Sequence, residues 1–241
     1  IVRKFVSQYD LEYPSVYQSL IFDAQKHSQA LNEENKRLQA LTKSLKNNLK
    51  ETEEQLNKCD ITGFYNHKFF KQYLENEVKN NQAKKLNSAL FLIDIDNMTA
   101  LNFKYGYSIS NKIIKKMAQI LEGMQKTTHS IFKLEGAVFA YYVPDVNQDE
   151  ASEFAEELRI EIANSKLFIE QITVSIGIAN LQEITKDDFG VAKKIEVISN
   201  KLYNLAKVRV SIAKKRGMNR ICYESSLEEI SDDSGKILIV D

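Results

Sequence analysis

The sequence predicts an α/β sandwich of the α+β kind, with a ferredoxin-like sheet, preceded by a long coiled-coil helix. Three observations carry this prediction. Residues 17–59 contain no Gly or Pro and fit a heptad repeat, strand and helix patterns alternate from residue 60 onward, and residues 131–145 have the pattern of one antiparallel hairpin. Alternation around a single hairpin favours an antiparallel-containing sheet with flanking helices.

The composition allows one sizeable core and an extended element, since 43% of the 241 residues are hydrophobic and 27% are charged. Lys+Arg and Asp+Glu both total 33, so no overall basic field indicates a nucleic-acid partner. The two cysteines, Cys59 and Cys222, stand in no zinc-binding or redox motif. No apolar run approaches the ~20 residues of a membrane span. We therefore expect a cytoplasmic protein with no nucleic-acid partner and no membrane segment in this fragment.

Four segments are expected along the chain. Residues 1–16 are the tail of an upstream element, residues 17–59 form the coiled-coil helix and residues 60–224 form the globular domain. Residues 225–241 are a polar linker and an apolar strand, which is either an ordinary terminal strand or, by resemblance, the first strand of a response-regulator receiver domain. Because the chain starts without methionine and stops directly after that strand, we expect it to be a piece of a longer protein.

The helix over 17–59 carries a continuous heptad seam. Leucines dominate one set of core positions, and the other set is polar through its middle and includes one asparagine. A single asparagine at such a position favours a two-stranded parallel pairing, so we expect a homodimer through this coiled coil. The alternative is one amphipathic helix packed on its own domain, although the polar flanks leave only a narrow apolar stripe. The seam contains Leu31, Asn35, Leu38, Leu45, Leu49 and Leu56.

Strand and helix patterns alternate through the globular part. The first long strand is apolar and ends in two carboxylates, Asp94 and Asp96, which lie two residues apart and hence on one face. The expected elements are a turn and helix over 59–78, a strand over 88–98, a helix over 110–124, the hairpin over 131–145, a helix over 149–165, a strand over 171–180 and a helix that ends within 212–223.

Five local motifs, in this order and spacing, resemble those of the GGDEF family of diguanylate cyclases over roughly residues 60–224. They are CDITGFYN for the family's D-x-LTG-L-x-N, FLIDIDNM for its strand ending in D-x-D, FKYGYSISNKII for N-D-x-x-GH-x-x-GD, TVSIGIA for TVSIG, and AKKRGMNR for AK-x-x-GRN. The resemblance implies the nucleotide-cyclase-type fold of that family, which often follows a coiled-coil stalk. A common fold does not by itself give a common function.

The resemblance also implies a reaction, in which two GTP molecules on two subunits condense to cyclic di-GMP. Two magnesium ions clamp the phosphates and activate the attacking hydroxyl. By position, Asp94 matches the metal-binding aspartate and Ile95 matches the residue that donates a backbone carbonyl. Asn102 matches the guanine-binding asparagine, and Lys214 matches a phosphate contact.

Other matched positions depart from the family. Asn111 stands where the family has an acidic residue that accepts hydrogen bonds from the donor edge of guanine. An amide recognises that edge less selectively than a carboxylate does. Lys126 and His129 stand where the inhibitory R-x-x-D motif has arginine and aspartate, so weak or no binding of cyclic di-GMP is expected there. In the family signature both acidic positions are apolar. The signature segment, as it is called here, consists of Glu135, Gly136, Ala137, Val138 and Phe139.

These departures favour a catalytically degenerate GGDEF domain that serves as a dimeric signalling or scaffold module with protein partners inside a larger regulator. One alternative is a slow diguanylate cyclase, in which Asp94 and Asp96 jointly hold one magnesium and Glu135 supplies a displaced carboxylate. The other is a non-catalytic sensor that binds GTP or ATP. No cofactor is expected, apart from Mg²⁺ if a nucleotide is bound.

Overall fold

The computed structural model describes residues 14–84, 86–186 and 194–224. The chain divides into two compact units, Ile1–Leu56 and Asn57–Asp241. The linker and terminal strand expected over 225–241, with the receiver resemblance, lie outside the described residues, and so do residues 1–13 of the expected upstream tail.

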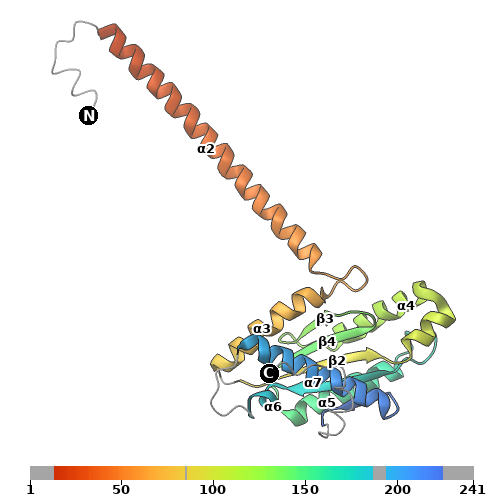
Figure 1. The fold of residues 1–241 in the computed structure, drawn as a ribbon. Coiled ribbons are helices and arrows are strands. Elements are labelled where there is room, and N and C mark those ends of the chain that lie inside the picture. Colours follow the sequence, from red (N-terminus) through yellow and green to blue (C-terminus); the bar gives the residue numbers. More distant parts are fainter. Residues whose placement is uncertain (1–13, 85, 187–193, 225–241) are drawn as a thin grey trace. The chain divides into compact units, whose positions relative to one another are not determined.

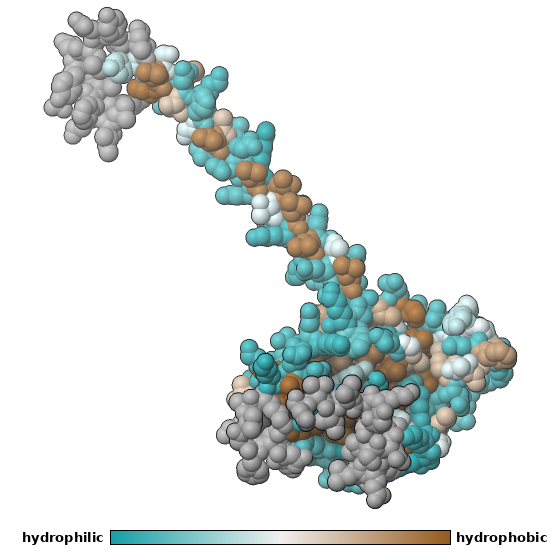
Figure 2. Space-filling model, viewed as in Figure 1, coloured by the Kyte–Doolittle hydropathy of each residue, from teal (hydrophilic) through white to brown (hydrophobic). Residues whose placement is uncertain are grey.

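The first unit contains one long helix, α2, which runs from Pro14 to Leu56. It begins three residues before the expected start, because proline fits the first turn of a helix, where its missing N–H has no partner to lose. It ends before Cys59, whose backbone N–H donates to Phe64 O at 2.8 Å in a turn of the second unit. Figure 2 shows apolar residues recurring along α2 among polar ones. The seam leucines are 51–68% exposed in the single chain.

Six strands form one mixed sheet. They are β1 (Tyr65–Asn66), β2 (Ser88–Ile95), β3 (Ser130–Lys133), β4 (Val138–Pro144), β5 (Val174–Asn180) and β6 (Arg220–Cys222). Their order in the sheet is β1-β3-β4-β2-β5-β6. β2 pairs antiparallel with β4 and β5, and β3 and β4 form the expected hairpin. β1 and β6 pair in parallel with β3 and β5. The prediction of an antiparallel-containing α/β sandwich is confirmed.

Helices cover both faces of the sheet, as Figure 1 shows. The helices are α3 (His67–Lys84), α4 (Met98–Gly123), α5 (Gln148–Asn164), α6 (Leu181–Lys186) and α7 (Ile195–Lys215). One core cluster joins the sheet to α4 and α5, and a second joins its other face to α3, α6 and α7. Alternate residues of β2 serve the two clusters, because neighbouring side chains of a strand point to opposite faces.

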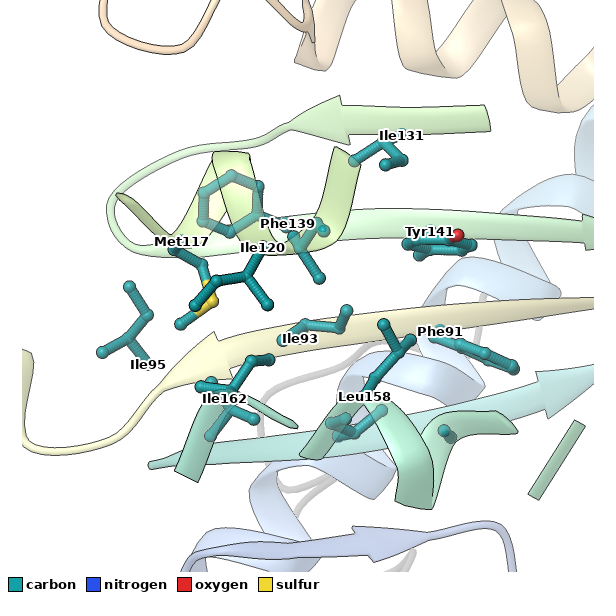
Figure 3. Close-up of a cluster of buried hydrophobic side chains, with 14 of the residues drawn as sticks. Phe91, Ile93, Ile95, Met117, Ile120, Ile131, Phe139, Tyr141, Leu158 and Ile162 are labelled. Atoms are coloured by element: carbon teal, nitrogen blue, oxygen red, sulfur yellow. The ribbon is translucent and has the colours of Figure 1, made fainter. Parts of the chain in front are cut away.

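The cluster under α4 and α5 is drawn in Figure 3. Phe91 and Ile93 of β2, Tyr141 of β4 and Leu158 of α5 are all fully buried there. On the opposite face, α7 lies directly against Gly177 of β5, because a Cβ added at that glycine would stand 2.1 Å from a backbone oxygen of α7. The centre of the sheet, which contains β2, is therefore packed against helices on both faces.

Two helices differ in their bounds from the sequence expectation. α4 begins at Met98, well before the predicted start at residue 110, and is broken at Gly106, whose φ of 78° and ψ of 166° are not helical. α5 starts at Gln148 behind a capping box, in which Asn147 and Glu150 each accept a hydrogen bond from the other's backbone N–H. The first turn of α4 follows the end of β2 after the two turn residues Asp96 and Asn97.

Candidate functional site

A cleft of about 1100 Å³ opens where β2 ends. Its walls come from the β3–β4 hairpin, α4 and the last turn of α7. The sheet register places Asp94 opposite Val138 of β4 and opposite Ser175 of β5. Most of the sequence-predicted site residues meet here. The cleft is lined by Asp94, Ile95, Asn102, Asn111, Glu135, Gly136, Ala137, Val138 and Lys214, whereas Asp96, Phe139, Lys126 and His129 do not line it.

Asp94 and Lys214 form an ion pair in this cleft. The Lys214 Nζ donates to Asp94 Oδ2 at 2.6 Å, and the two side chains are 32% and 21% exposed, respectively. The lysine comes from the last turn of α7 and the aspartate from the end of β2. The cation matched to the family's phosphate contact and the anion matched to its metal ligand therefore neutralise each other.

Asp96 has a different environment, although it follows Asp94 by two residues. It is 3% exposed. Its Oδ2 accepts from Thr173 Oγ1 at 2.8 Å and from the backbone N–H of Asn219 at 2.9 Å, and its Oδ1 accepts from Ser175 Oγ at 2.7 Å. Both carboxylate oxygens are therefore engaged, and they tie the end of β2 to β5 and to the turn after α7.

The signature segment forms the turn of the β3–β4 hairpin. The Val138 N–H donates to Glu135 O at 3.2 Å, and Gly136 adopts a positive φ of 58°. Ala137 is only 8% exposed and packs in the core cluster under α4. The Glu135 side chain is 90% exposed, and its Oε1 lies 3.4 Å from His67 Nδ1. The turn thus presents one exposed carboxylate, which has a partner outside the cleft lining.

Lys133 is buried beside the signature segment, and the sequence alone does not point to it. It is 5% exposed, and its Nζ donates to the carbonyl oxygens of Leu134 at 2.8 Å and Gly136 at 2.6 Å. The ammonium also lies 5.1 Å from the ring centroid of Phe139. Burial lowers the pKa of Lys133, while Cys59 and Asp94 act in the opposite direction. In the sequence it is only a lone lysine inside the apolar strand IFKL.

Two asparagines of α4 face the cleft. The side-chain oxygen of Asn102 is buried and has no hydrogen-bond partner among the described residues, whereas Asn111 is exposed. Phe103 and Tyr107 flank the break at Gly106 and are 97% and 78% exposed. This wall of the cleft therefore combines an unpaired acceptor with two exposed aromatic rings.

The two inhibitory-motif positions lie apart from the cleft lining. His129 is 7% exposed, and its Nδ1 lies 3.1 Å from the Tyr141 hydroxyl. The rings of His129 and Phe154 are 5.2 Å apart, and the Lys126 ammonium lies 5.6 Å from the Phe154 ring centroid. Burial, followed by the charge of Lys126, lowers the pKa of His129. His129 is therefore a core residue in this fold.

No three His, Cys, Asp or Glu side chains gather into a metal-binding group in the described ranges. Among the helices within those same ranges, none has the length and apolar character needed to cross a membrane.

Comparison with known families gives one match that covers most of the globular unit. The family model described as "Diguanylate cyclase, GGDEF domain" matches residues 57–220. An uncharacterized membrane protein of Staphylococcus epidermidis is 27% identical over 168 residues, which are 68% of this chain and 44% of that relative. An uncharacterized membrane protein of Staphylococcus aureus is 28% identical over 169 residues, with the same two shares. The chain thus matches less than half the length of these relatives.

Solved structures resemble both the globular unit and the helix before it. The coiled coil and GGDEF domain of DgcB from Caulobacter crescentus, in complex with c-di-GMP, gives a TM-score of 0.67 at 19% identity and covers 81% of this chain and 100% of that one. The diguanylate cyclase SiaD from Pseudomonas aeruginosa, in complex with its activator SiaC, gives 0.61 at 16% identity and covers 87% and 78%. At these identities the likeness shows the fold alone.

Proposed function

The chain belongs to the GGDEF domain family, and we propose that this member does not make cyclic di-GMP but serves as a dimeric signalling module of a larger regulatory protein. The observation that carries the proposal is the set of side chains at the end of β2. Asp94 is the carboxylate there that opens to the cleft, and Lys214 already neutralises it.

These residues do not fit a pair of magnesium ions. Magnesium is held by oxygen ligands, and two ions need several carboxylate or carbonyl oxygens arranged around them. Ala137 and Val138 have only hydrocarbon side chains at the signature's two acidic positions. Ile95 could offer a backbone carbonyl, which is a weaker ligand than the missing carboxylates. These side chains therefore supply too few oxygen ligands for catalysis by two metal ions.

The contacts also weigh against the slow cyclase. That alternative requires Asp96 or Glu135 to complete the metal site. Asp96 is buried and accepts three hydrogen bonds through both oxygens, so freeing it would leave three donors without partners. Glu135 extends toward His67, with its carboxylate oxygen 3.4 Å from the imidazole. Each residue already has a structural partner that would have to be given up.

Nucleotide binding without turnover is the second candidate, and one observation favours it. The cleft is large enough for a nucleotide, and the buried Asn102 oxygen in its wall has no partner within the described part of the chain. A buried acceptor without a hydrogen bond is costly unless a ligand or water satisfies it. The amide of Asn111 both donates and accepts, so this wall would discriminate guanine from adenine less sharply than a carboxylate would.

Assembly and partners form the remaining part of the proposal. The DgcB structure contains a coiled coil before its GGDEF domain, and SiaD was solved with a protein activator. By analogy, α2 would pair two copies of this chain. Protein partners would bind the dimer and either respond to its conformation or change it. A cytoplasmic location for the domain stays a prediction. The relatives are named membrane proteins, and this chain covers 44% of their length.

A product assay tests the loss of catalysis. Purified chain incubated with GTP and either magnesium or manganese is expected to yield no cyclic di-GMP above a reaction without protein, measured by chromatography with mass detection. Turnover that disappears in Asp94→Ala but persists in Asp149→Ala, an exposed aspartate on α5, would overturn the proposal and support the slow cyclase.

Calorimetry tests the sensor. If the cleft binds a nucleotide, GTP and ATP should give heats of binding that Asn102→Ala reduces, and omission of magnesium should change them little because Asp94 is already paired with Lys214. No heat with either nucleotide would remove this candidate, and binding that depends strictly on magnesium would contradict the account of the metal site.

A further inference from the structure

Residues 57–66, which lead into the sheet and include β1, form a turn held by its own backbone, and this segment is called the N-terminal turn below. The N–H groups of Thr62 and Gly63 both donate to Cys59 O, at 3.3 and 2.8 Å, and the Asn66 N–H donates to Asn57 O at 2.7 Å. The turn ends in β1, which pairs in parallel with β3 so that Asn66 stands in register with Lys133. The first segment after α2 is thus attached to the hairpin strand.

The same turn also contacts the hairpin through side chains. The ring of Phe64 meets the ring of Phe139 edge to face, with centroids 6.4 Å apart. Ile61 lines the cleft together with Ala137. Phe139 and Ala137 belong to the signature segment, so the N-terminal turn touches the segment that shapes the cleft. If the two segments are firmly connected, a displacement of the N-terminal turn would also move the signature segment.

Lys133 contacts the signature segment from the strand that pairs with the N-terminal turn. Its backbone lies in β3 beside β1, and its ammonium reaches the carbonyl oxygens of Leu134 and Gly136 across the turn. A third carbonyl oxygen, that of Val138, lies 3.4 Å from the same Nζ. The lysine ammonium carries three N–H donors at the end of a flexible side chain, so one group can contact all three carbonyl oxygens. These backbone acceptors hold the ammonium, and no carboxylate makes a hydrogen bond with it among the described residues.

We propose that Lys133 is a positioning residue that couples the N-terminal turn to the signature segment, so that a change at the turn following the stalk alters the shape of the cleft. The strand ladder between β3 and β4 persists without the ammonium, because its hydrogen bonds are made by the backbone. The turn itself, in contrast, has few other restraints: the Leu134 and Val138 N–H bonds close it, and the Ala137 oxygen accepts from the Ile95 N–H at a long 3.5 Å. The coupling concerns conformation and does not require the domain to be active or inactive.

Hydrogen exchange in the whole chain tests the positioning role. The change Lys133→Met keeps most of the side-chain volume and removes the donors. We expect the Val138 and Ile95 amides to exchange about tenfold faster or more, because the turn loses at least one hydrogen bond from a charged donor. Amides around Leu158 in α5 should change less than about twofold. Lys133→Arg should restore most of the protection, and Lys115→Met, at an exposed lysine of α4, should change none of it.

A double-mutant cycle tests the coupling itself. Phe64→Leu weakens the contact of the N-terminal turn with Phe139. It should speed exchange at Val138 several-fold when Lys133 is present and less than about twofold in the Lys133→Met background. Equal effects in both backgrounds would overturn the proposal, and so would uniform acceleration that includes α5, because that would make Lys133 a general stabilising residue. Should the Met variant not fold, the cycle is run with Lys133→Gln, whose shorter, uncharged side chain cannot make all three carbonyl contacts. An effect of Phe64→Leu as large as in the native chain would then contradict the coupling.

Discussion

Asp94 and Asp96 illustrate how much two neighbouring carboxylates can differ at the scale of single residues. One lies at the cleft with a lysine partner, and the other is buried as an acceptor for three donors from two other segments. Buried acceptors of this kind stabilise a fold because each donor would otherwise be left without a partner. The second carboxylate is therefore a structural residue of this site.

This difference gives a prediction for stability. Asp96→Ala should lower the free energy of unfolding by about 3 kcal/mol or more, because it leaves buried donors unpaired. Asp94→Ala, the same exchange two residues earlier, should cost less than about 1.5 kcal/mol because its ion pair is partly open to water. Urea denaturation of both variants checks this. Equal losses would show that Asp94 contributes to folding as much as Asp96 does.

His129 gives a prediction about pH. Its pKa in the folded chain is lowered, first by burial and then by Lys126, so the unfolded chain binds the proton more readily. Stability should therefore fall as the pH decreases below the ordinary histidine value of about 6.5. The urea midpoint should drop more between pH 7.5 and 5.5 in the native chain than in His129→Gln. Parallel curves for the two proteins would assign the pH dependence to other groups.

The residue scale also shows where sequence reasoning stops. Asp94, Asn102 and Lys214 were placed at one site from motif positions, and the structure brings them to one cleft. The role of Asp96 could not be predicted, because its donors come from residues 173, 175 and 219 and meet it only in the folded sheet. Lys133 was overlooked for a similar reason, since a charged residue within a strand gives no sign of which carbonyl groups it will reach.

At the level of elements, the backbone of α7 lies very close to β5. This contact depends on Gly177, because α7 backbone atoms occupy the space of a side chain there. A glycine at the centre of a sheet often marks such a close approach. The helix that carries Lys214 is positioned by this contact, and so is the ion pair at the cleft.

Substitution of Gly177 should strongly reduce the stability of the fold. Gly177→Ala should cost about 3 kcal/mol or more, because the new methyl group would stand 2.1 Å from Ala206 O and the backbone would have to shift. Gly123→Ala is the matched control. Nothing lies within 4 Å of the added Cβ at that helix end, so the change should be neutral or stabilising by up to about 1 kcal/mol. Thermal unfolding measures both, and a mild effect at Gly177 would mean that α7 can move outward freely.

The bounds of α4 were the least predictable feature at this scale. The expected helix over 110–124 corresponds only to its second part, which carries the regular apolar spacing. The first part precedes Gly106, whose positive φ interrupts the helix, and within it Phe103 is 97% exposed instead of belonging to a buried apolar stripe. Hydrophobic periodicity cannot indicate a helical turn that packs so little of its surface, whereas the apolar runs of β2 and β4, which are buried along nearly their whole length, are easily recognised.

At the scale of the whole molecule, dimerisation through α2 is the most direct prediction. Replacing Leu38 and Leu45 together by Ala should remove about 2 to 5 kcal/mol per site from the pairing and give monomers at micromolar concentration, with the globular domain still folded. Leu20 and Leu41 are also more than half exposed but lie outside the seam, so their double Ala variant is the control and should stay dimeric. Sedimentation gives the masses. A native chain that sediments as a monomer would remove the coiled coil from the proposed function.

The outer margins of the sheet have a consequence for such an assembly. β1 at one side contains two residues and β6 at the other contains three. A long edge strand has many unpaired backbone N–H and C=O groups, through which the sheets of different molecules can pair. A short edge strand offers few such groups. The Lys58 ammonium, 5.8 Å from the Tyr65 ring centroid, adds charge beside β1. Two copies held at high local concentration would therefore meet through side-chain surfaces, which separate and re-form easily, and aggregation by sheet extension would be suppressed.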